Sequence, residues 1–343
     1  MKAAFLTGLR KLEVSEVPIP VPSGEEVLVG LKSVGICGSD VHYYTHGKIG
    51  KQFCKYPQII GHEPSGTIEE PGKSVKRLKK GDRVIIEPQI PCGECHWCRQ
   101  GKHNICPSVR FLGTPPIDGA YSEYIVMPEK NLILLPDELS YEEGALTEPL
   151  AVALHAVKLA GDLKGKNIGI FGSGTIGLSI MIAARIYGAK MIICTDVLDY
   201  RLEFAKKIGA DHTVNPKKEN VYEFIREKTK GLLLDVVFEA AGNCDAINDS
   251  ARATTYGGIC IVSGIPAEDS VSLEIHEMRK KEFNLKVLRR SHNNVREAIE
   301  LIKSKKVDIL SIVTHRFGLA EISKAFETAS EYRDNVIKTM INI

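Results

Sequence analysis

Hydrophobic and polar positions change their spacing near Ala151, and this change divides the chain into two regions. From Met1 to about Leu150, short apolar runs alternate with polar positions and are separated by turn residues. The run VLVGLKSVGI alternates into a glycine, Gly81–Ile86 is a turn that leads into a strand, and Pro71-Gly72 marks another turn. Short strands between Gly and Pro turns are typical of antiparallel sheets. We therefore predict a barrel-like β domain in this region.

After Ala151, short apolar strands alternate with helical periodicity. The predicted strands are Ile168–Phe171, Met191–Thr195, Leu234–Phe238 and Ile259–Val262, and the predicted helices are Ile176–Tyr187 and Arg201–Ile208. Such alternation is typical of a doubly wound parallel sheet, so the predicted fold class is α/β. The last part of the chain reads as helix 295–303, strand 312–317, helix 319–330 and strand 336–343, and on pattern alone it could join either domain.

Bulk composition excludes several classes of protein. The chain has 343 residues, 43% apolar content and a formal net charge of +2, which suits about two globular domains and gives no support for a nucleic-acid partner. We find no signal-like apolar segment near Met1 and no run long enough to span a bilayer. Nine cysteines, read as free thiols and metal ligands, indicate a reducing, cytoplasmic location.

Four of these cysteines form a motif with the spacing C-x2-C-x2-C-x7-C: Cys92, Cys95, Cys98 and Cys106. Short C-x2-C turns bring thiolates together for tetrahedral zinc. An iron–sulfur cluster is the rival interpretation, but the fourth cysteine follows after seven residues rather than three. The spacing therefore favours a structural zinc site.

A glycine motif, Gly172-Ser173-Gly174-Thr175-Ile176-Gly177, follows the strand IGIF and opens an apolar helix. In this context G-x-G-x-x-G predicts a dinucleotide site, with pyrophosphate over the helix N-terminus. Asp196 ends the next predicted strand, where a carboxylate can accept both ribose hydroxyls and would repel a 2′-phosphate. We predict NAD rather than NADP, although Arg201 lies one turn later and could line the adenosine face. The alternative interpretation is that Asp196 merely ends a strand.

A second set of metal-type residues is Cys37, His62 and Glu63, in glycine-bracketed segments that we expect to be loops. Two anionic ligands and one neutral ligand would balance Zn²⁺ and leave one position open, as in a catalytic site. Asp40 is a candidate acceptor for the second N–H of His62. Glu148 is a further candidate, and a helix-start carboxylate is an equally good interpretation of it.

The chain resembles the zinc-dependent medium-chain alcohol dehydrogenases, because GHEPSGTIEEPGKSV (61–75) matches their zinc signature. Within that family it is most similar to sorbitol (polyol) dehydrogenases, through CGSDVHYYTHGKIG (37–50), FLGTPPIDG (111–119) and EPLAVALHA (148–156). The resemblance implies a GroES-like β-barrel catalytic domain (1–150 and 289–343) that carries a structural zinc lobe (91–107). It also implies an inserted Rossmann NAD-binding domain (151–288), and assembly as a homotetramer or homodimer.

The resemblance also implies roles for individual residues. Cys37, His62 and Glu63 would hold a catalytic zinc, Glu148 would bind the metal or its water, and Cys92, Cys95, Cys98 and Cys106 would hold a second, structural zinc. The nucleotide would be bound by Gly172, Gly174, Thr175, Ile176, Gly177, Asp196 and Arg201. Substrate contacts would come from Ser39, Tyr43, Ile49, Phe111, Thr114 and Arg290. The family usually has Arg-Tyr where this chain has Arg290-Ser291, which would enlarge the polyol pocket.

The predicted reaction is oxidation of a secondary hydroxyl of a polyol, of the sorbitol or xylitol type, to a ketone, with hydride passed to NAD. Zinc would act as a Lewis acid, and Ser39 and His42 would carry the proton toward solvent. For His42 a surface-turn histidine is an equally good interpretation, and a water chain through Glu148 would serve as well. Enzyme alternatives are L-threonine 3-dehydrogenase and 2,3-butanediol dehydrogenase. A protein of a different class, a non-catalytic nucleotide-binding protein, would be expected to lack the metal ligands.

Overall fold

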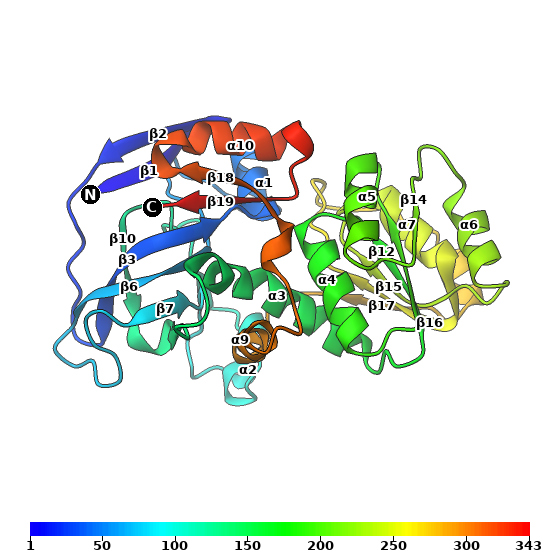
Figure 1. Ribbon diagram of the computed structural model, residues 1–343, viewed down its shortest axis with the longest axis horizontal. Helices are drawn as coiled ribbons and strands as arrows, with labels where there is room; N and C mark the ends of the chain where they lie inside the picture. The colour runs from blue at the N-terminus through cyan, green and yellow to red at the C-terminus, as the bar shows by residue number, and fades with distance from the viewer. The chain divides into compact units, whose positions relative to one another are not determined.

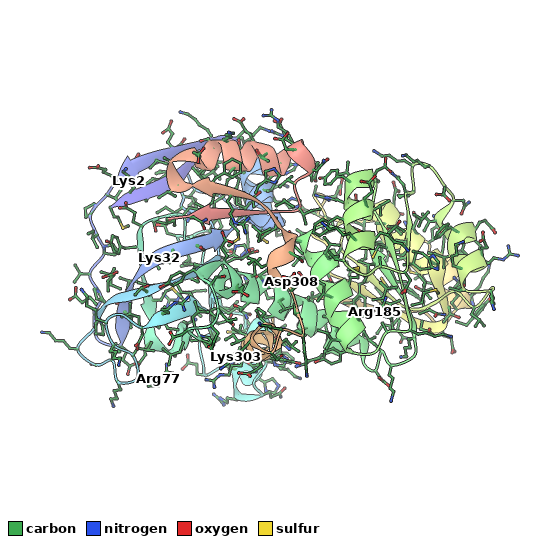
Figure 2. All side chains as sticks on the ribbon, in the orientation of Figure 1. Lys2, Lys32, Arg77, Arg185, Lys303 and Asp308 are labelled. Carbon is green, nitrogen blue, oxygen red and sulfur yellow. The ribbon has the colours of Figure 1, made fainter.

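A computed structural model describes residues 1–343 and divides the chain into two compact units (Figure 1). The first unit consists of Met1–Glu148 and Val295–Ile343, and the second consists of Pro149–Asn294. None of the helices combines the length and the apolar character that a bilayer-crossing segment needs. Charged side chains such as Arg185 and Lys303 lie on the surface (Figure 2).

The first unit is built around a seven-stranded sheet. Its order is β11 (Leu132–Leu134), β7 (Arg83–Ile86), β6 (Glu63–Pro71), β3 (Glu26–Gly35), β19 (Lys338–Asn342) and β18 (Val313–Gly318), with β10 (Tyr124–Pro128) also paired to β3. The pairs are antiparallel except for β18 and β19. Since β19 pairs directly with β3, the C-terminal part of the chain belongs to this sheet, which the sequence pattern alone left open.

Shorter elements complete the first unit. They are the strands β1 (Lys2–Gly8), β2 (Lys11–Glu16), β4 (Lys48–Ile49), β5 (Gln52–Phe53), β8 (Gln89–Ile90) and β9 (Arg110–Phe111), and the helices α1 (Gly38–His46), α2 (His96–Arg99), α9 (Val295–Lys303) and α10 (Ile322–Ser330). Helix α10 packs against β18, β19 and β2 (Figure 1). The aromatic rings of Tyr121 and Phe326 meet edge to face in the core, with their centroids 5.6 Å apart.

The second unit is an open six-stranded parallel sheet with the strand order β14-β13-β12-β15-β16-β17. The strands are β12 (Asn167–Phe171), β13 (Met191–Thr195), β14 (His212–Val214), β15 (Leu234–Glu239), β16 (Thr254–Val262) and β17 (Asn284–Val287). The helices are α4 (Thr175–Ile186), α5 (Asp199–Lys207), α6 (Val221–Lys228), α7 (Cys244–Ala253) and α8 (Ile275–Lys280). The inner strands are apolar on both faces, as parallel strands covered by helices require.

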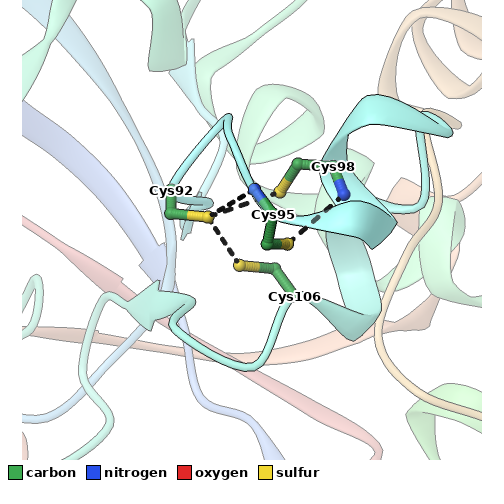
Figure 3. Close-up of side chains that lie close together, drawn as sticks. All are labelled: Cys92, Cys95, Cys98 and Cys106. Carbon is green, nitrogen blue, oxygen red and sulfur yellow. Dashed lines mark hydrogen bonds between the residues drawn. The ribbon is translucent and has the colours of Figure 1, made fainter.

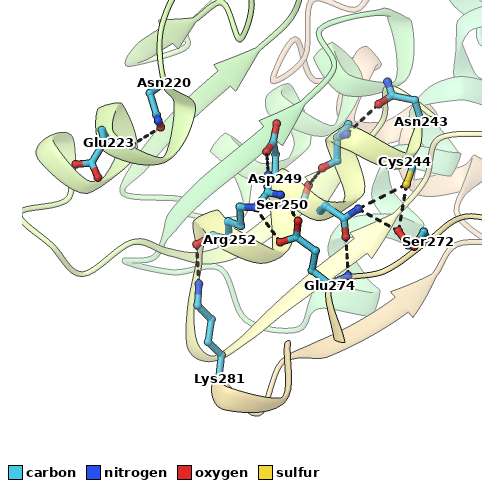
Figure 4. Close-up of polar contacts among 12 residues, drawn as sticks. Asn220, Glu223, Asn243, Cys244, Asp249, Ser250, Arg252, Ser272, Glu274 and Lys281 are labelled. Carbon is cyan, nitrogen blue, oxygen red and sulfur yellow. Dashed lines mark hydrogen bonds and ion pairs between the residues drawn. The ribbon is translucent and has the colours of Figure 1, made fainter. Parts of the chain in front are cut away.

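Helix α7 is fixed at both ends by side chains (Figure 4). The Asn243 carboxamide accepts a hydrogen bond from the amide of Ala246 at the N-terminus of α7. At its C-terminus the buried ammonium of Lys281 donates to the carbonyls of Ala251, Arg252 and Thr254. Both contacts satisfy backbone groups that the helix itself leaves unpaired.

Most of the expected elements are confirmed, but six helices were not predicted, among them α2, α6, α7 and α8. Strand β13 and helix α9 have the predicted bounds. The expected helix 319–330 is a 3₁₀ turn, Leu319–Glu321, followed by α10. The sequence analysis did not predict α1, which starts where we expected a loop after Cys37, or α3 (Tyr141–Ala160), which contains Pro149.

Candidate metal centres and nucleotide-binding site

Cys37, His62 and Glu63 lie close together because β3 ends beside the start of its antiparallel neighbour, β6. Strand β3 pairs with β6 in a register that sets Gly35 opposite Glu63. Cys37 follows β3 as the N-cap residue of α1, and His62 immediately precedes β6. The ligand atoms of the three side chains all lie within 4.8 Å of one another. A Cβ atom at Gly35 would lie 2.0 Å from Glu63 Oε2. Glycine is therefore required at position 35, where the Glu63 carboxylate lies against the backbone of β3.

The imidazole of His62 is oriented by Asp40. Its Nδ1 lies 3.2 Å from Asp40 Oδ1, as the sequence analysis expected, and its Nε2 lies 3.5 Å from Ser39 Oγ. An Nδ1–H bond to a carboxylate fixes the tautomer in which Nε2 carries the lone pair. The nitrogen that a metal needs is therefore the one that faces Ser39.

Asp40 is completely buried and accepts several hydrogen bonds besides that of His62. The amides of Cys37 and Gly61 donate to it at 3.0 and 3.2 Å, and the Tyr121 hydroxyl donates at 3.0 Å. Tyr121 is also fully buried, and burial together with the charge of Asp40 raises the pKa of its hydroxyl well above the usual range. The sequence analysis missed Tyr121, because nothing in the motif spacing connects it to residue 40.

Glu63 has a buried counter-ion that was also missed. Lys338 forms an ion pair with Glu63 Oε2 and donates to the carbonyl of Ile36 at 2.8 Å. The two side chains are 0% and 1% exposed. A signal was present, since Lys338 is the lone charge in the apolar strand VIKTMINI. The ion pair leaves Glu63 Oε1 available for a metal.

Glu148 lies near this cluster but is not one of the three residues whose ligand atoms are mutually within 4.8 Å. It occupies the middle of α3, not a helix start. Burial raises the pKa of its carboxyl to about 8; His62 and Lys338 oppose the shift, and the charges of Glu63 and Glu87 add to it. A carboxyl group held in this way can exist as a neutral acid or, beside a cation, as a carboxylate.

The donor set fits a zinc ion. Burial on its own lowers the pKa of His62, but the charges of Asp40 and Cys37 outweigh it and raise the pKa well above its ordinary value. The cluster therefore attracts positive charge. One thiolate, one carboxylate and one imidazole are ligands that Zn²⁺ accepts, and metal binding displaces the proton from such an imidazole.

Most of the expected substrate contacts lie in the first unit. Ser39 and Tyr43 are on α1, which also carries His42, the expected member of the proton relay. Burial raises the pKa of Tyr43, and a hydrogen bond with Thr114, which acts in the opposite direction, shows that these two residues are neighbours. The ring of Phe111 lies 5.3 Å from that of His62.

Two other expected substrate contacts, Ile49 and Arg290, and the expected relay residue His42 lie in different surroundings from the residues around His62. Ile49 packs at the edge of the first unit's core, and Arg290 belongs to the second unit. The ring of His42 lies 5.6 Å from that of the exposed His46, one turn along α1.

The four cysteines of the lobe also converge (Figure 3). Sγ of Cys92 lies 3.9 Å from that of Cys98 and 3.6 Å from that of Cys106. Tetrahedral Zn–S bonds of about 2.3 Å place neighbouring sulfurs about 3.8 Å apart. Backbone amides, chiefly that of Cys95, lower the pKa of Cys92 to about 7, whereas burial and the neighbouring thiols raise that of Cys98 to about 12. Four thiolates at this separation require a cation, so the lobe fits structural zinc.

Each glycine of the nucleotide motif has a separate reason to be glycine. Gly172 has φ +102°, and a Cβ atom there would lie 2.6 Å from the amide nitrogen of Ala241. A Cβ atom at Gly177 would lie 1.8 Å from the carbonyl oxygen of Gly172, so this residue lets α4 pack on the loop. Gly174 is the N-cap of α4, and a Cβ atom there would have only the side chain of Arg201 within 4 Å. The loop thus leaves the α4 N-terminus, with Thr175 and Ile176, open to an anion.

Asp196 directly follows β13 and is oriented by backbone amides. Its Oδ2 accepts from the amide of Ser173 at 2.8 Å, and its Oδ1 accepts from that of Leu198 at 3.0 Å. Arg201 Nη1 lies 3.6 Å from Oδ2. Each carboxylate oxygen can accept more than one hydrogen bond, so Asp196 retains acceptor capacity for hydroxyl groups.

Comparisons with known proteins agree with this architecture. Residues 23–137 match the alcohol dehydrogenase GroES-like domain, and residues 175–304 match the zinc-binding dehydrogenase domain. The chain belongs to the zinc-dependent medium-chain alcohol dehydrogenase family, and its fold is a GroES-like domain with a Rossmann-like domain. Both the family and the fold class were predicted from the sequence and are confirmed.

Individual relatives cover nearly the whole chain. A sorbitol dehydrogenase of Bacillus subtilis is 39% identical over 99% of this chain and 97% of that protein. A sorbitol dehydrogenase of Gallus gallus is 40% identical over 96% of this chain and 93% of its own length. The crystal structure of an Escherichia coli oxidoreductase/dehydrogenase of unknown specificity superposes with a TM-score of 0.94 at 36% identity, over 100% of this chain and 99% of the other.

Proposed function

We propose that the protein is a zinc-dependent, NAD-linked dehydrogenase that oxidises a secondary hydroxyl of a polyol to a ketone. One observation carries the proposal: the ligand atoms of Cys37, His62 and Glu63 lie within 4.8 Å of one another, and Asp40 directs the imidazole toward them. Similarity to sorbitol dehydrogenases over nearly the whole chain supports the substrate class.

The chain's own residues would prepare a hydroxyl substrate for oxidation. A bound zinc would supply Lewis-acid stabilisation of the alkoxide, and an oxidised nicotinamide would accept the hydride. Ser39 Oγ, 3.5 Å from His62 Nε2, is in reach of a group at the metal position and would accept the hydroxyl proton while giving up its own proton toward His42. His42, one turn along α1, would pass this proton outward. Glu148, a buried carboxyl group that interacts with His62 and Glu63, offers a second route for the proton.

A polyol suits the charges around this cluster better than a simple alcohol does. Glu63 and Glu148 are carboxyl groups that can accept hydrogen bonds from neighbouring hydroxyls. The phenol of Tyr43 and the hydroxyl of Thr114, which lie side by side, add further polar groups. A substrate with one hydroxyl would leave some of them unpaired, and buried unpaired groups weaken binding.

NAD is the proposed cofactor because a carboxylate, Asp196, lies at the end of β13. It would accept the two adenosine ribose hydroxyls, and its charge would repel a 2′-phosphate. Two zinc ions per chain are proposed, one in the Cys37 cluster and one in the four-cysteine lobe. Equal Michaelis constants for NAD and NADP would contradict the cofactor assignment, and one zinc per chain would contradict the metal assignment.

Initial rates with a substrate panel test the proposed function. The panel is xylitol, sorbitol, L-threonine and 2,3-butanediol, each with NAD and with NADP, on protein loaded with zinc. We expect the highest kcat/KM for one of the two sugar alcohols with NAD. A preference for L-threonine or 2,3-butanediol would assign the chain to one of those alternatives. No turnover with any alcohol, together with one zinc per chain, would indicate a non-catalytic nucleotide-binding protein.

A further inference from the structure

A buried carboxyl group in the second unit has no role in the mechanism above. Glu239 is the last residue of β15 and is 0% exposed. In the sheet register it lies opposite Phe171, the last residue of β12, and opposite Val262, the last residue of β16. Glu239 is therefore level with the carboxyl-terminal ends of three adjacent parallel strands.

This position corresponds to the switch point of the sheet. Chain order runs outward from β12 to β13 and β14 on one side, and to β15, β16 and β17 on the other. Dinucleotides cross the carboxyl edge of such a sheet at the switch point, with the pyrophosphate over the glycine loop. Asp196 lies on the β13 side, where the adenosine half belongs. The nicotinamide half therefore extends over the loops that follow β15 and β16.

Glu239 connects these two loops. Its Oε1 accepts hydrogen bonds from the amides of Ala241 at 2.9 Å and Gly242 at 2.6 Å, in the loop after β15. Its backbone carbonyl accepts from the amides of Ser263 at 2.7 Å and Gly264 at 3.1 Å, in the loop after β16. One residue thus binds the backbone of both loops.

The two loops are packed backbone against backbone around this carboxyl group. A Cβ atom at Gly264 would lie 2.2 Å from the amide nitrogen of Gly242 and 2.8 Å from Glu239 Oε2. A Cβ atom at Gly242 would lie 2.6 Å from the carbonyl oxygen of Ile265. The spacing of the loops consequently depends on glycine backbones and on the side chain between them.

Burying a carboxyl group costs free energy that an apolar side chain packed between the two loops would not require. Oε2 is buried and makes no hydrogen bond. Burial raises the pKa of Glu239, although the nearby amides of Gly242, Ala241, Gly264 and Asn243 act in the opposite direction. An apolar side chain would fill the same space without leaving a buried oxygen unsatisfied. What an apolar side chain could not do is accept the two amide hydrogens of the loop after β15.

We propose that Glu239 is a positioning residue for the nicotinamide half of the dinucleotide, because it sets the spacing of the loops at 240–243 and 263–265. The proposal depends on the nucleotide binding proposed above. The first loop ends at Asn243, the N-cap of α7 (Figure 4), so its other end is already fixed. With both of its ends held, this loop has a fixed position at the carboxyl edge of the sheet, where the nicotinamide half would lie.

The test compares a whole cofactor with its adenosine half. The probes are NADH, measured by its own fluorescence, and AMP, measured by calorimetry, on the zinc-loaded protein. For Glu239→Ala we expect the Kd of NADH to rise at least about tenfold and kcat/KM for NAD to fall up to about 100-fold, the effect of displacing a reacting group by ~1 Å. The Kd of AMP should change by less than about twofold, because AMP ends at the glycine loop.

Conservative and control variants complete the experiment. Glu239→Gln keeps the acceptor for Ala241 and Gly242 and should recover most of the NADH affinity. Asp235→Ala is a matched control at the opposite end of β15, where Asp235 accepts the amide of Asn167 at 2.7 Å. Asp235→Ala should lower the melting temperature without changing the ratio of the Kd of NADH to the Kd of AMP. If Glu239→Ala does not fold, Glu239→Asp, which shortens the side chain by one carbon, replaces it.

Equal weakening of NADH and AMP would overturn the proposal, since it would indicate a general structural role. Unchanged NADH binding in Glu239→Ala would also overturn it, as would failure of Glu239→Gln to rescue. Failure of the proposed function is distinguishable, because in that case the wild-type protein itself would not bind NADH.

Discussion

The two metal-type clusters are built in opposite ways. The four-cysteine lobe takes all its ligands from residues 92–106, and two of its thiols accept hydrogen bonds from backbone amides of the same segment. The Cys37 cluster takes its ligands from the ends of β3 and β6, and its supporting side chains from α1, β19 and residue 121. In a local cluster such as the lobe, the turns between the ligands are enough to determine the positions of the ligand atoms. A distributed cluster needs the register of the whole sheet, so it is coupled to the fold of the first unit.

The charge around the two clusters differs as well. In the lobe, burial and the neighbouring thiols raise the pKa of Cys98, whereas backbone amides lower that of Cys92. Around Glu63, a buried lysine already balances one carboxylate before any metal binds. Loss of zinc from the four-cysteine lobe should therefore lower the stability of the fold. Loss of zinc from the Cys37 cluster should instead lower activity.

The largest expected effects come from exchanging one cysteine in each cluster. Cys37→Ser should lower kcat/KM on the order of 10³-fold, because loss of the metal removes several kcal/mol of transition-state stabilisation. Its melting temperature should stay near that of the wild type, since Lys338 still pairs with Glu63. Activity, zinc content and thermal unfolding are measured together. Cys244→Ser, in the second unit, is the control, and an active Cys37→Ser protein would contradict the ligand assignment.

Cys95→Ser should show the converse behaviour. Loss of a structural metal lowers the free energy of unfolding by about 4 kcal/mol or more, and one zinc per chain should be lost. Denaturant unfolding in the presence of excess zinc measures the loss in the free energy of unfolding. If Cys95→Ser were as stable as the wild type and still active, the lobe would not be a folding element, and the proposed difference between the clusters would be wrong.

Lys338→Met tests the buried ion pair that supports the distributed cluster. Removing one partner of a buried pair costs about 3–5 kcal/mol, because the other charge is left uncompensated. Chemical denaturation of the metal-free protein measures this cost. Lys303→Met is the matched control, since the ion pair of Lys303 with Glu138 is on the surface and should contribute much less to stability than the buried pair. The double variant Lys338→Met/Glu63→Gln should recover part of the loss; no recovery would mean that the two residues are not coupled.

Glu148 predicts a pH dependence of the metal-free protein. Its carboxyl has a pKa of about 8 when folded and an ordinary value near 4.5 when unfolded. Between these values the folded state holds a proton that the unfolded state has released, so stability is lost as pH rises through this window. In the wild type this loss amounts to at most about 1.4 kcal/mol of unfolding free energy per pH unit, and Glu148→Gln should remove it. Unfolding free energies at pH 5, 6 and 7 for both proteins check it, and parallel pH profiles would contradict it.

The smallest effect is expected for Tyr121→Phe. The variant removes a hydroxyl that donates to the buried carboxylate of Asp40, and a hydrogen bond to a charged group contributes about 1.5–3 kcal/mol. We expect a loss of stability near the lower value, because Asp40 keeps its other donors. Tyr256→Phe, at a side chain that is 74% exposed, is the control and should be neutral. An equal effect of the two variants would show that Tyr121 does not support His62.

The two clusters also explain what the sequence could and could not predict. The lobe was predicted from spacing alone, because short turns determine where the four thiols go. The nucleotide loop was predicted for the same reason, since Gly172 and Gly177 act within one strand–turn–helix unit. The ligands Cys37, His62 and Glu63 were selected through motifs and family resemblance. Their mutual distances depend on the β3–β6 register, which the sequence does not state.

The missed features have physical reasons too. Helix α3 contains Pro149 in its interior, a residue that normally ends or kinks a helix. Lys338 and Tyr121 act through contacts with residues more than 80 positions away in the chain. Glu239 directly follows the predicted strand Leu234–Phe238, and no motif in the sequence indicates its hydrogen bonds with two loops. Apolar periodicity predicts which side chains are buried, but it does not predict which buried polar groups meet.

The ion pair of Glu63 with Lys338 has a consequence for the order of folding. The two residues are separated by 275 positions, and the whole second unit lies between them. On a ribosome, residues 149–294 are therefore complete before the counter-ion of Glu63 has been synthesised. The parallel sheet can form while the β-barrel is still missing a central strand. Delivery of zinc to the Cys37 cluster should consequently be a late event, after β19 has inserted beside β3.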